Sequence, residues 1–336
     1  MTFKVVKNFE MPIPYEDEVF NKIGAEIVRK NCPTEDALID LTHDADGMIA
    51  VTFFAPMTRR VIEKLDKCKV IANIGVGYEN VDVDAATEHG VCVCNVPDYC
   101  IDEVSDHTMA LILACNRKLF VSQKALKEGG QWIGTLPLQM RPLSKLRGQT
   151  VGLIGFGKIP RMLVPKAQGF GMRVVTYDPN ITRDVGLSLG VDWVDLDTLL
   201  AQSDFVSIHC ALTNHNHKML STEQFKKMKS SAYLINTARG GLVDEEALYT
   251  ALTEKVIAGA ALDVMDPEPP VADNPLIKLD NAIITAHTAH VSDISWDEIF
   301  RRPVEEVAKV LQGGWPLRWV NPEVRGRFAA RWGKAV

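Results

Sequence analysis

Residues 149–179, QTVGLIGFGKIPRMLVPKAQGFGMRVVTYDP, carry the pattern from which the rest of the chain can be interpreted. The apolar, β-branched run Thr150–Ile154 predicts a buried parallel strand. The turn Gly155-Phe156-Gly157 follows, then a helical segment and a second strand, Arg173–Tyr177, which ends at Asp178. This order of strand, glycine turn, helix, strand and acid is typical of a dinucleotide-binding unit, because glycines let the backbone approach a pyrophosphate at a helix N-terminus.

The acid fits this interpretation better than the glycines do. Asp178 follows Gly155 at about the 20-residue spacing expected of the acid that binds the ribose hydroxyls, and it favours NAD over NADP because a 2′-phosphate would meet a like charge. Pro160 stands where a third glycine is usual. It is tolerated in a first helical turn but removes one phosphate donor, and we expect it to weaken the grip on the cofactor. Pro165 is expected to kink the helix. A unit of this shape that binds nothing remains an alternative.

Length and composition restrict the class of protein. The 336 residues are enough for two domains, and 46% hydrophobic with 24% charged residues is the composition of an ordinary globular protein. A net charge of −6 argues against nucleic acid as the main partner. The chain opens on a strand-like FKVV without a signal-peptide pattern, and no apolar run approaches the roughly 18 residues that span a bilayer. We therefore expect a cytoplasmic protein that does not bind membranes.

The cysteines and histidines do not predict a metal site. Seven scattered cysteines without a C-x-x-C pair are expected to be buried free thiols in a reducing compartment. His215 and His217 lack a clearly placed third ligand, so a polar loop is the preferred interpretation and no metal is expected.

The first hundred residues alternate short strands and helices, which predicts a small α/β domain. Strands are expected at Lys4–Val6, Gly47–Thr52, Val70–Ile74 and Val91–Val96, and helices at Tyr15–Val28, Thr58–Lys67 and Asp84–His89. Beyond the central unit, strands are expected at Phe205–His209, Ala232–Asn236, Val256–Leu262 and Ala282–Thr285, with helices at Leu196–Gln202, Thr222–Met228 and Glu245–Lys255.

Four further segments connect or close these parts. Glu103–Arg117 is apolar at helical spacing and is expected to be a long helix that enters the central domain. Residues 129–148 are rich in Gly, Pro and polar residues and predict a loop that joins domains or clasps a partner. Ser292–Gln312 is expected to be a closing helix that returns to the first domain, and the basic tail Arg325–Val336 is expected to be mobile.

The later strands end on residues whose side chains can take part in catalysis or binding. Arg239 follows one strand, Glu268 lies in the DVMDPEPP segment after the next, and His287 closes the last. Singly, each has a structural explanation: a surface ion pair, a solvated loop, a hydrogen-bonded strand-end histidine. In a doubly wound sheet, however, ligands bind at the carboxyl ends of the strands. Together these residues predict an active site at that edge.

From Val70 to Asn321 the chain resembles the D-isomer-specific 2-hydroxyacid dehydrogenases. The resemblance rests on NIGVGYENVDVDAATEHGVCVCNVP, the G-F-G-K-I turn with YDP, LINTARGGLVDEEAL, and GAALDVMDPEP followed by ITAH. Within that family, FVSIHCALTNHNHKML and NTARGGLVDE are most similar to the branch that contains the C-terminal-binding protein corepressors.

The resemblance implies an α/β fold in which a doubly wound parallel sheet (a Rossmann-type NAD domain) is inserted in a smaller flavodoxin-like substrate domain. The NAD domain would span residues 103–292, and the substrate domain residues 1–102 and 293–336. It also implies a homodimer and an NAD-dependent oxidoreductase that interconverts a D-2-hydroxy acid and a 2-oxo acid.

By the same resemblance, Arg239 anchors the substrate, His287 is the acid/base and Glu268 tunes it. The implied cofactor contacts are Val76, Thr108, Gly155, Gly157, Lys158, Ile159, Asp178, Cys210, Ala211, Asn216, Thr237, Ala238, Arg239, Asp263, His287 and Ala289. The implied substrate contacts are Asn73, Val76, Gly77, Arg239, His287 and His290. The chemistry requires such residues: an arginine to bind a carboxylate bidentately, a histidine to supply a proton near neutrality, and a carboxylate beside it to favour the imidazolium. Nicotinamide supplies the hydride.

Two positions depart from the corepressor pattern, and two alternatives remain. His290 stands where the corepressors carry tryptophan, and Asn73 where they carry arginine. Both are expected to face the substrate, so the identity of the 2-oxo acid does not follow, and His290 could compete for the acid/base role. The alternative function is an NAD(H)-sensing interaction protein in which turnover is incidental. A dehydrogenase of formate type is disfavoured, because a carboxylate, Glu268, partners the histidine.

Overall fold

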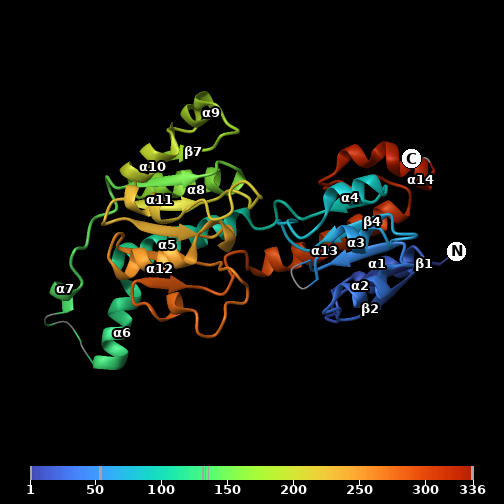
Figure 1. Cartoon of the computed structure of the whole chain (residues 1–336), viewed down its shortest axis with the longest axis horizontal. Coiled ribbons are helices and arrows are strands. Elements are labelled where there is room, and N and C mark those ends of the chain that lie inside the picture. The colour runs from blue at the N-terminus through green and yellow to red at the C-terminus, as the bar shows by residue number, and fades with distance from the viewer. Residues whose placement is uncertain (1, 53–54, 131, 133, 135, 334–336) are drawn as a thin grey trace. The chain divides into compact units, whose positions relative to one another are not determined.

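The computed structural model describes residues 2–52, 55–130, 132, 134 and 136–333. The chain divides into two compact units, one formed by Met1–Tyr99 with Ser292–Val336 and the other by Cys100–Val291. The elements of both are labelled in Figure 1. The predicted fold class is confirmed, because each unit is a parallel sheet accompanied by helices. The roles predicted for the two parts, substrate binding and NAD binding, are not tested by this division and stay predictions.

The first unit is built on a five-stranded sheet of order β2-β1-β3-β4-β5 in which every pair is parallel. Its strands are β1 (Phe3–Lys7), β2 (Ala25–Arg29), β3 (Gly47–Ala50), β4 (Val70–Asn73) and β5 (Cys92–Cys94). Its helices are α1 (Glu16–Lys22), α2 (Glu35–Thr42), α3 (Arg59–Ile62), α4 (Val83–Glu88), α13 (Asp293–Leu311) and α14 (Arg325–Trp332), with a 3₁₀ turn at η3 (Pro322–Val324).

The second unit is built on a seven-stranded parallel sheet of order β12-β11-β10-β9-β6-β7-β8. Its strands are β6 (Thr150–Ile154), β7 (Arg173–Tyr177), β8 (Asp192–Trp193), β9 (Phe205–Ile208), β10 (Tyr233–Asn236), β11 (Gly259–Leu262) and β12 (Ala282–Ile284). Its helices are α5 (Ile101–Arg117), α6 (Leu119–Gly129), α7 (Leu136–Gln139), α8 (Lys158–Gly169), α9 (Arg183–Ser188), α10 (Leu196–Gln202), α11 (Thr222–Lys227) and α12 (Glu245–Thr253), with 3₁₀ turns at η1 (Gly240–Leu242) and η2 (Pro275–Lys278).

The strand order of the second unit places a ligand crevice. The chain runs from β6 outward to β7 and β8, then returns to the other side of β6 with β9. The order therefore reverses between β6 and β9, and in open sheets of this kind ligands bind at the carboxyl ends of the strands beside such a reversal. Those ends all lie at one edge because every strand is parallel.

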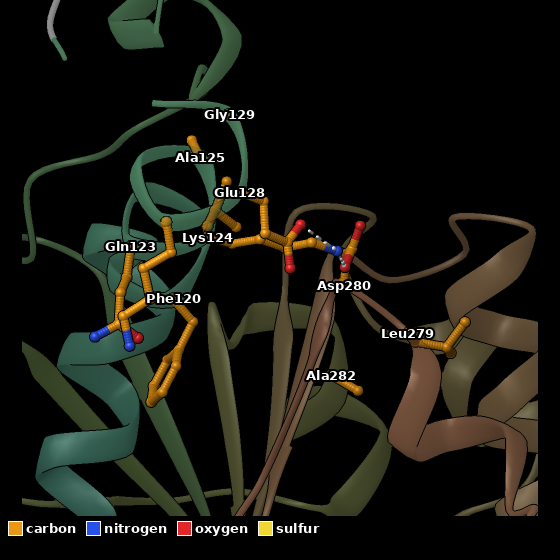
Figure 2. Close-up of a pocket in the computed structure, with 11 residues that line it drawn as sticks. Phe120, Gln123, Lys124, Ala125, Glu128, Gly129, Leu279, Asp280 and Ala282 are labelled. Atoms are coloured by element: carbon orange, nitrogen blue, oxygen red, sulfur yellow. Dashed lines mark hydrogen bonds and ion pairs between the residues drawn. The ribbon is translucent and has the colours of Figure 1, made fainter. Parts of the chain in front are cut away.

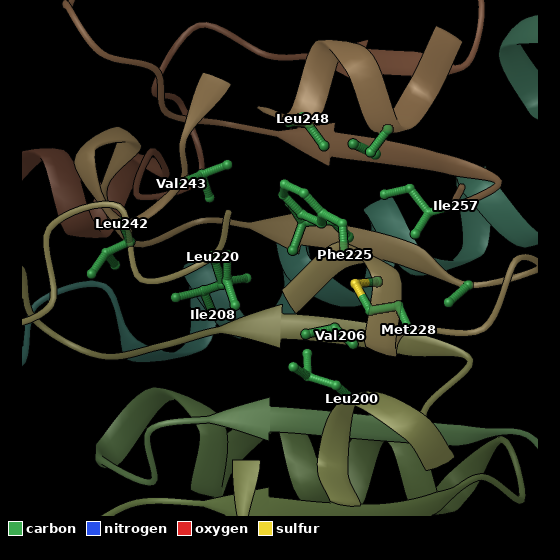
Figure 3. Packing of buried hydrophobic residues seen from close by; sticks show 14 of the residues in the cluster. Leu200, Val206, Ile208, Leu220, Phe225, Met228, Leu242, Val243, Leu248 and Ile257 are labelled. Carbon is green, nitrogen blue, oxygen red and sulfur yellow. The ribbon is translucent and has the colours of Figure 1, made fainter. Parts of the chain in front are cut away.

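Alternation along the buried strands gives the sheet two apolar faces. Leu234 of β10 and Val206 of β9 belong to a cluster covered by α10, α11 and α12, which Figure 3 shows around Phe225 and Leu248. The next strand residue, Ile235, belongs to the opposite cluster with side chains of α5 and α8. Both faces are filled because a parallel sheet buries both sides, so its strands read as continuous apolar runs.

The structure corrects several sequence predictions. The helix expected at Tyr15–Val28 is wrong in its second half, since α1 ends at Lys22 and Gly24, with φ 65°, turns the chain into β2. The sequence analysis also missed α2, α6, α9 and β8. Within residues 129–148 a short helix, α7, is present, and residues 131, 133 and 135 lie outside the described part. The helix α8 continues through Pro165 without ending there.

The C-terminal tail is not free over its described length. Residues 325–332 form α14, and the guanidinium of Arg331 donates to the carbonyl oxygens of His89, Leu65 and Asp66 at 2.5, 2.6 and 3.1 Å. Trp332 adds an N–H bond of 2.8 Å to the carbonyl of Gly90. The prediction of a mobile tail is therefore wrong up to Gly333, and residues 334–336 lie outside the described part.

Two further expectations concern composition. All seven cysteines are free thiols, and all but Cys210 are buried, as expected. No helix in the part of the chain that the structure describes is both long and apolar enough to cross a membrane.

Candidate active site

The two glycines of the turn after β6 differ in what surrounds them. Gly155 has φ 93°, and a Cβ there would lie 2.8 Å from the carbonyl carbon of His209 and 2.9 Å from the amide nitrogen of Cys210. A side chain is excluded because β9 and the turn meet at the reversal of strand order. Gly157 has an ordinary φ, and a Cβ there meets nothing within 4 Å. The protein itself requires Gly155, whereas Gly157 faces open space that a ligand can enter.

The acid at the end of β7 is fixed beside this turn. One carboxylate oxygen of Asp178 accepts from the N–H of Phe156 at 2.8 Å, and the other from the N–H of Asn180 at 2.8 Å. Each oxygen keeps a second lone pair to accept from a ribose hydroxyl. The first helical positions of α8, Lys158 and Ile159, carry N–H groups without intrahelical acceptors. These residues fit a dinucleotide.

Pro160 occupies the third position of α8 and is buried. Its missing N–H is one of the four that have no partner inside a helix, so the helix loses nothing, while a phosphate loses one donor. The expected weakening of cofactor binding stays a prediction.

Further cofactor candidates of this unit lie on α5 and after β9 and β10. Thr108 of α5 and Thr237 share a hydroxyl–hydroxyl bond of 3.0 Å, and Thr108 is buried. Asn216 donates to the carbonyl of Ala211 at 2.7 Å and accepts from the N–H of Thr213 at 2.7 Å, so its amide holds its own loop. Ala238, Cys210 and Ala211 lie at the same sheet edge, partly exposed or exposed. Their contacts with NAD stay predictions.

Asp263, directly after β11, organises the turn that carries the histidine. Its buried carboxylate accepts from the hydroxyl of Thr285 at 2.5 Å and from the N–H groups of Thr288 at 3.0 Å and Ala289 at 2.9 Å. Its carbonyl accepts from the N–H of His287 at 2.8 Å. His287 has φ 52°, a left-handed conformation that costs free energy for any residue with a Cβ. The bonds to Asp263 offset that cost.

The structure brings Glu268 and His287 together. The His287 Nδ1 lies 2.7 Å from one carboxylate oxygen of Glu268, and the other oxygen accepts from the N–H of Met265 at 2.9 Å. An ionised carboxylate only accepts, so Nδ1 carries the proton and donates. The second ring nitrogen, Nε2, is then available to exchange a proton with a substrate. The side chain of His287 is 44% exposed and that of Glu268 is 14% exposed, so the pair is open at the histidine end.

His290 stands beside His287 but in a different state. The two rings lie 5.7 Å apart in an edge-to-face arrangement. Burial lowers the pKa of His290, and the positive charge of His287 lowers it further. The charged form of His290 is therefore disfavoured. His209, at the end of β9, is kept neutral, because burial lowers its pKa to about 3.

Arg239 lies in a turn that packs against the loop containing Glu268. Asn236 at the end of β10 donates to the carbonyl of Arg239 at 2.8 Å and accepts from the N–H of Ala238 at 3.0 Å. A Cβ on Gly240 would lie 2.0 Å from the carbonyl of Met265. Only glycine permits this contact, so the arginine turn and the carboxylate loop lie directly against each other.

The first unit holds the predicted carboxylate loop, with its carbonyl oxygens bound from within. Asn95 donates to the carbonyl of Val76 at 2.7 Å, Asn73 to that of Gly77 at 2.6 Å, and the N–H of Val96 to that of Gly75 at 2.9 Å. Across a trans peptide, N–H and C=O point in opposite directions, so the N–H groups of residues 76–78 point away from these bonds. Backbone N–H groups in such a loop are donors that suit a carboxylate, and the predicted contact of Val76 and Gly77 with the substrate stays a prediction.

Asn73 has a different environment from the one expected. It is 1% exposed, and its amide oxygen accepts from the hydroxyl of Thr52 at 2.8 Å while its nitrogen holds Gly77. Both polar ends of the side chain are used inside the unit. The predicted contact with substrate stays untested, and the structure shows Asn73 holding the loop.

Two residues at the site were missed by sequence reasoning. His107 of α5 lies 3.2 Å from the hydroxyl of Thr285 and 3.6 Å from the carboxylate of Asp263. Asn236 sets the Arg239 turn. His107 stands in no quoted motif, whereas Asn236 belongs to the NTARGGLVDE segment, for which the sequence predicted no role at this position. No group of three His, Cys, Asp or Glu residues in the described ranges is arranged to hold a metal ion.

A doubly wound NAD-type sheet with an imidazole–carboxylate pair at its carboxyl edge defines the class, a nicotinamide-dependent oxidoreductase. Residues 109–289 match the family model of the D-isomer specific 2-hydroxyacid dehydrogenase NAD binding domain. A glyoxylate reductase of Korarchaeum cryptofilum is 36% identical over 292 residues, which cover 87% of each chain. A D-3-phosphoglycerate dehydrogenase of Methanocaldococcus jannaschii is 41% identical over 281 residues, 83% of this chain and 52% of that one.

A solved structure agrees. A glyoxylate reductase from Paecilomyes thermophila superimposes with a TM-score of 0.85 at 26% identity, covering 96% of this chain and 99% of that one. This chain belongs to the D-isomer specific 2-hydroxyacid dehydrogenases. It is an NAD-dependent oxidoreductase that interconverts 2-hydroxy and 2-oxo acids. The narrower resemblance to the corepressor branch stays a prediction.

The contrast between the two glycines gives a test that separates folding from cofactor binding. Gly157→Ala should leave the unfolding free energy nearly unchanged, because the new methyl meets no protein atom. It should weaken NADH binding about tenfold or more, or roughly 1.4 kcal/mol, because the methyl occupies ligand space. Gly155→Ala should lose about 1–3 kcal/mol of stability through its clash with the backbone. Chemical denaturation and NADH fluorescence titration measure the two effects, and equal NADH affinity in Gly157→Ala and wild type would contradict the cofactor assignment.

Proposed function

We propose that Arg239, Glu268 and His287 carry out the family reaction in this chain. The observation that carries the proposal is the 2.7 Å bond between His287 Nδ1 and Glu268. It fixes the tautomer and leaves Nε2 directed away from the carboxylate. In reduction, Nε2 donates its proton to the carbonyl oxygen of the 2-oxo acid, and in oxidation the neutral ring takes that proton back. NADH, when bound, supplies the hydride.

Arg239 has a distinct task in this proposal. Its guanidinium binds the substrate carboxylate through two parallel N–H bonds and so orients the carbonyl carbon. The half-buried position of Arg239 suits this, because an anion there is partly shielded from water. Its turn rests on the loop of Glu268, so anchoring and proton transfer share one rigid support.

His290 is the other candidate for the catalytic acid, but its lowered pKa argues against that role. Reduction needs a charged imidazolium, and burial lowers the pKa of His290, which disfavours that form. We assign it to shaping the substrate space. The alternative, an NAD(H)-sensing interaction protein, gains no specific support from the residues around Glu268, since a sensor needs no proton donor held beside a carboxylate.

In this proposal, the pair of Glu268 and His287 sets the pH dependence of the reaction rate. The rate of reduction falls as pH rises and the imidazolium is lost, and the rate of oxidation falls as pH drops and the ring is protonated. Glu268→Gln preserves the shape but removes the charge that stabilises the imidazolium. The falling limb of reduction should move to lower pH, because the amide no longer carries the charge that favours the imidazolium. Oxidation should extend into more acid conditions, and KM should change less than kcat.

The measurement is a pair of pH–rate profiles, one in each direction, for wild type, Glu268→Gln and His290→Gln. His290→Gln should leave the midpoint of the falling limb in place. If His290→Gln moves that midpoint and Glu268→Gln does not, the acid is His290 and the proposed assignment is wrong.

We further propose that the protein is a homodimer. Within the described residues, α6 buries none of its side chains, and Leu119, Phe120 and Leu126 are 54%, 52% and 42% exposed. A pocket of about 670 Å³ lies between α6 and the edge strand β12. Figure 2 shows Phe120 among the residues that line it, and the ion pair of Lys124 with Asp280. A helix with exposed apolar side chains beside an edge strand is a surface that a second copy can cover. The free thiols fit a cytoplasmic location, which stays a prediction.

Light scattering tests the dimer. The wild type should have about twice the chain mass of 37.2 kDa. Leu119→Asp with Phe120→Asp should shift it towards the monomer, because two charges would have to be buried in the interface. Leu317→Asp, at a position 72% exposed in the other unit, is the control and should leave the mass unchanged. A wild type of single-chain mass would refute the proposal.

A further inference from the structure

Glu245, at the start of α12, binds the loop that carries Glu268. One of its carboxylate oxygens accepts from the backbone N–H of Asp266 at 2.8 Å. The other accepts from the side-chain amide of Asn274 at 2.8 Å, and Asn274 in turn accepts from the N–H of Leu276 at 3.0 Å. Glu245 is half-buried and Asn274 is 6% exposed. A single carboxylate thus spans both ends of the loop from Val264 to Asn274.

Glu268 lies inside the loop that these bonds close. Its own backbone tie is the N–H of Met265, the residue next to Asp266. Gly240 also lies directly against the backbone of Met265 and Asp266. The loop is therefore held by two constraints, first the close approach of Gly240 and second the carboxylate of Glu245. Removing Glu245 takes away the second of these constraints from the part of the loop next to Glu268.

We propose that Glu245 is a positioning residue that keeps the carboxylate of Glu268 in register with His287. The proposal rests on the function proposed above for that pair. Glu245 has no part in the proton transfer itself. It acts through the backbone of Asp266, and the misplacement of a catalytic group by about 1 Å can cost a hundredfold in rate.

The chemistry of the contact requires a carboxylate. Both partners of Glu245, the backbone N–H and the Asn274 amide nitrogen, are donors. Glutamine offers one acceptor and one donor, so Glu245→Gln keeps one bond and places its NH₂ against that of Asn274. Replacing Asn274 by Asp as well restores both bonds with the polarity of the second reversed. The double variant carries the same net charge as the wild type.

Other charged groups nearby stay in place in these variants. Around Glu245 they are Asp244, which lies 3.6 Å from Lys218, and Asp266, which lies 3.9 Å from His217. Around His287 they are Glu268, His290 and Asp263, with His107 behind Asp263. A shift of the pH profile in Glu245→Gln that the double variant reverses is therefore due to the position of Glu268.

The test compares wild type, Glu245→Gln, Glu245→Gln/Asn274→Asp, Glu268→Gln and a matched control, Glu246→Gln. Glu246 is the exposed neighbour in the same helical turn and undergoes the same chemical change. The measured quantities are kcat and KM for reduction, the pH–rate profile, NADH affinity and the denaturation midpoint. Glu245→Gln should lower kcat about tenfold with a smaller change in KM, and move the falling limb towards that of Glu268→Gln. NADH affinity should not change.

The double variant should recover most of the lost kcat and return the limb to higher pH, and Glu246→Gln should match the wild type. If Glu245→Gln matches Glu246→Gln, the inference is wrong. It is also wrong if Glu245→Gln loses activity only in proportion to stability, with an unshifted pH profile. If Glu268→Gln itself behaves as wild type, the failure lies in the proposed function, and the inference falls with it.

Discussion

The hydrogen bonds of the buried Asp263 carboxylate are the interaction on which the site depends. A buried ionised group is costly unless polar hydrogens surround it, and here Thr285, Thr288 and Ala289 supply them. The same bonds hold His287 in a left-handed conformation that it would not otherwise favour. Strand β11 delivers Asp263 and strand β12 delivers the turn, so the sheet register fixes the position of the histidine.

Two neighbouring imidazoles at the site have different surroundings. His287 is nearly half exposed and faces Glu268, whereas His290 is largely buried and faces the positive charge of His287. Burial disfavours the charged form of His290, whereas His287 is open to solvent and bonded to a carboxylate, so two similar side chains are suited to different roles. The loop of Glu268 is held in turn by Gly240 and Glu245. The loops after β10 and β11 therefore pack together with the start of α12.

The sequence predicted those features that depend on local pattern. The strands β6 and β7 agree with the structure to the residue, because apolar β-branched runs and the glycine turn mark them. The Glu268–His287 contact was implied by the family resemblance, and the structure shows it. What failed depended on tertiary contacts: the end of α1 at Gly24 and the docking of α14 through Arg331. Glu245 lies in the NTARGGLVDE segment, but nothing in the local pattern shows that it binds the loop of Glu268, and a histidine such as His107 in an apolar helix is ordinary.

An enzyme, as opposed to a sensor of NAD(H), must turn over a 2-oxo acid. The most direct measurement is NADH oxidation at saturating concentration with a panel of 2-oxo acids (glyoxylate, hydroxypyruvate, pyruvate, phenylpyruvate and branched analogues), followed by chiral analysis of each product that has a stereocentre. The account predicts sustained turnover with at least one member and a product of the D configuration. Tight NADH binding with no turnover across the whole panel would contradict it and favour the sensor.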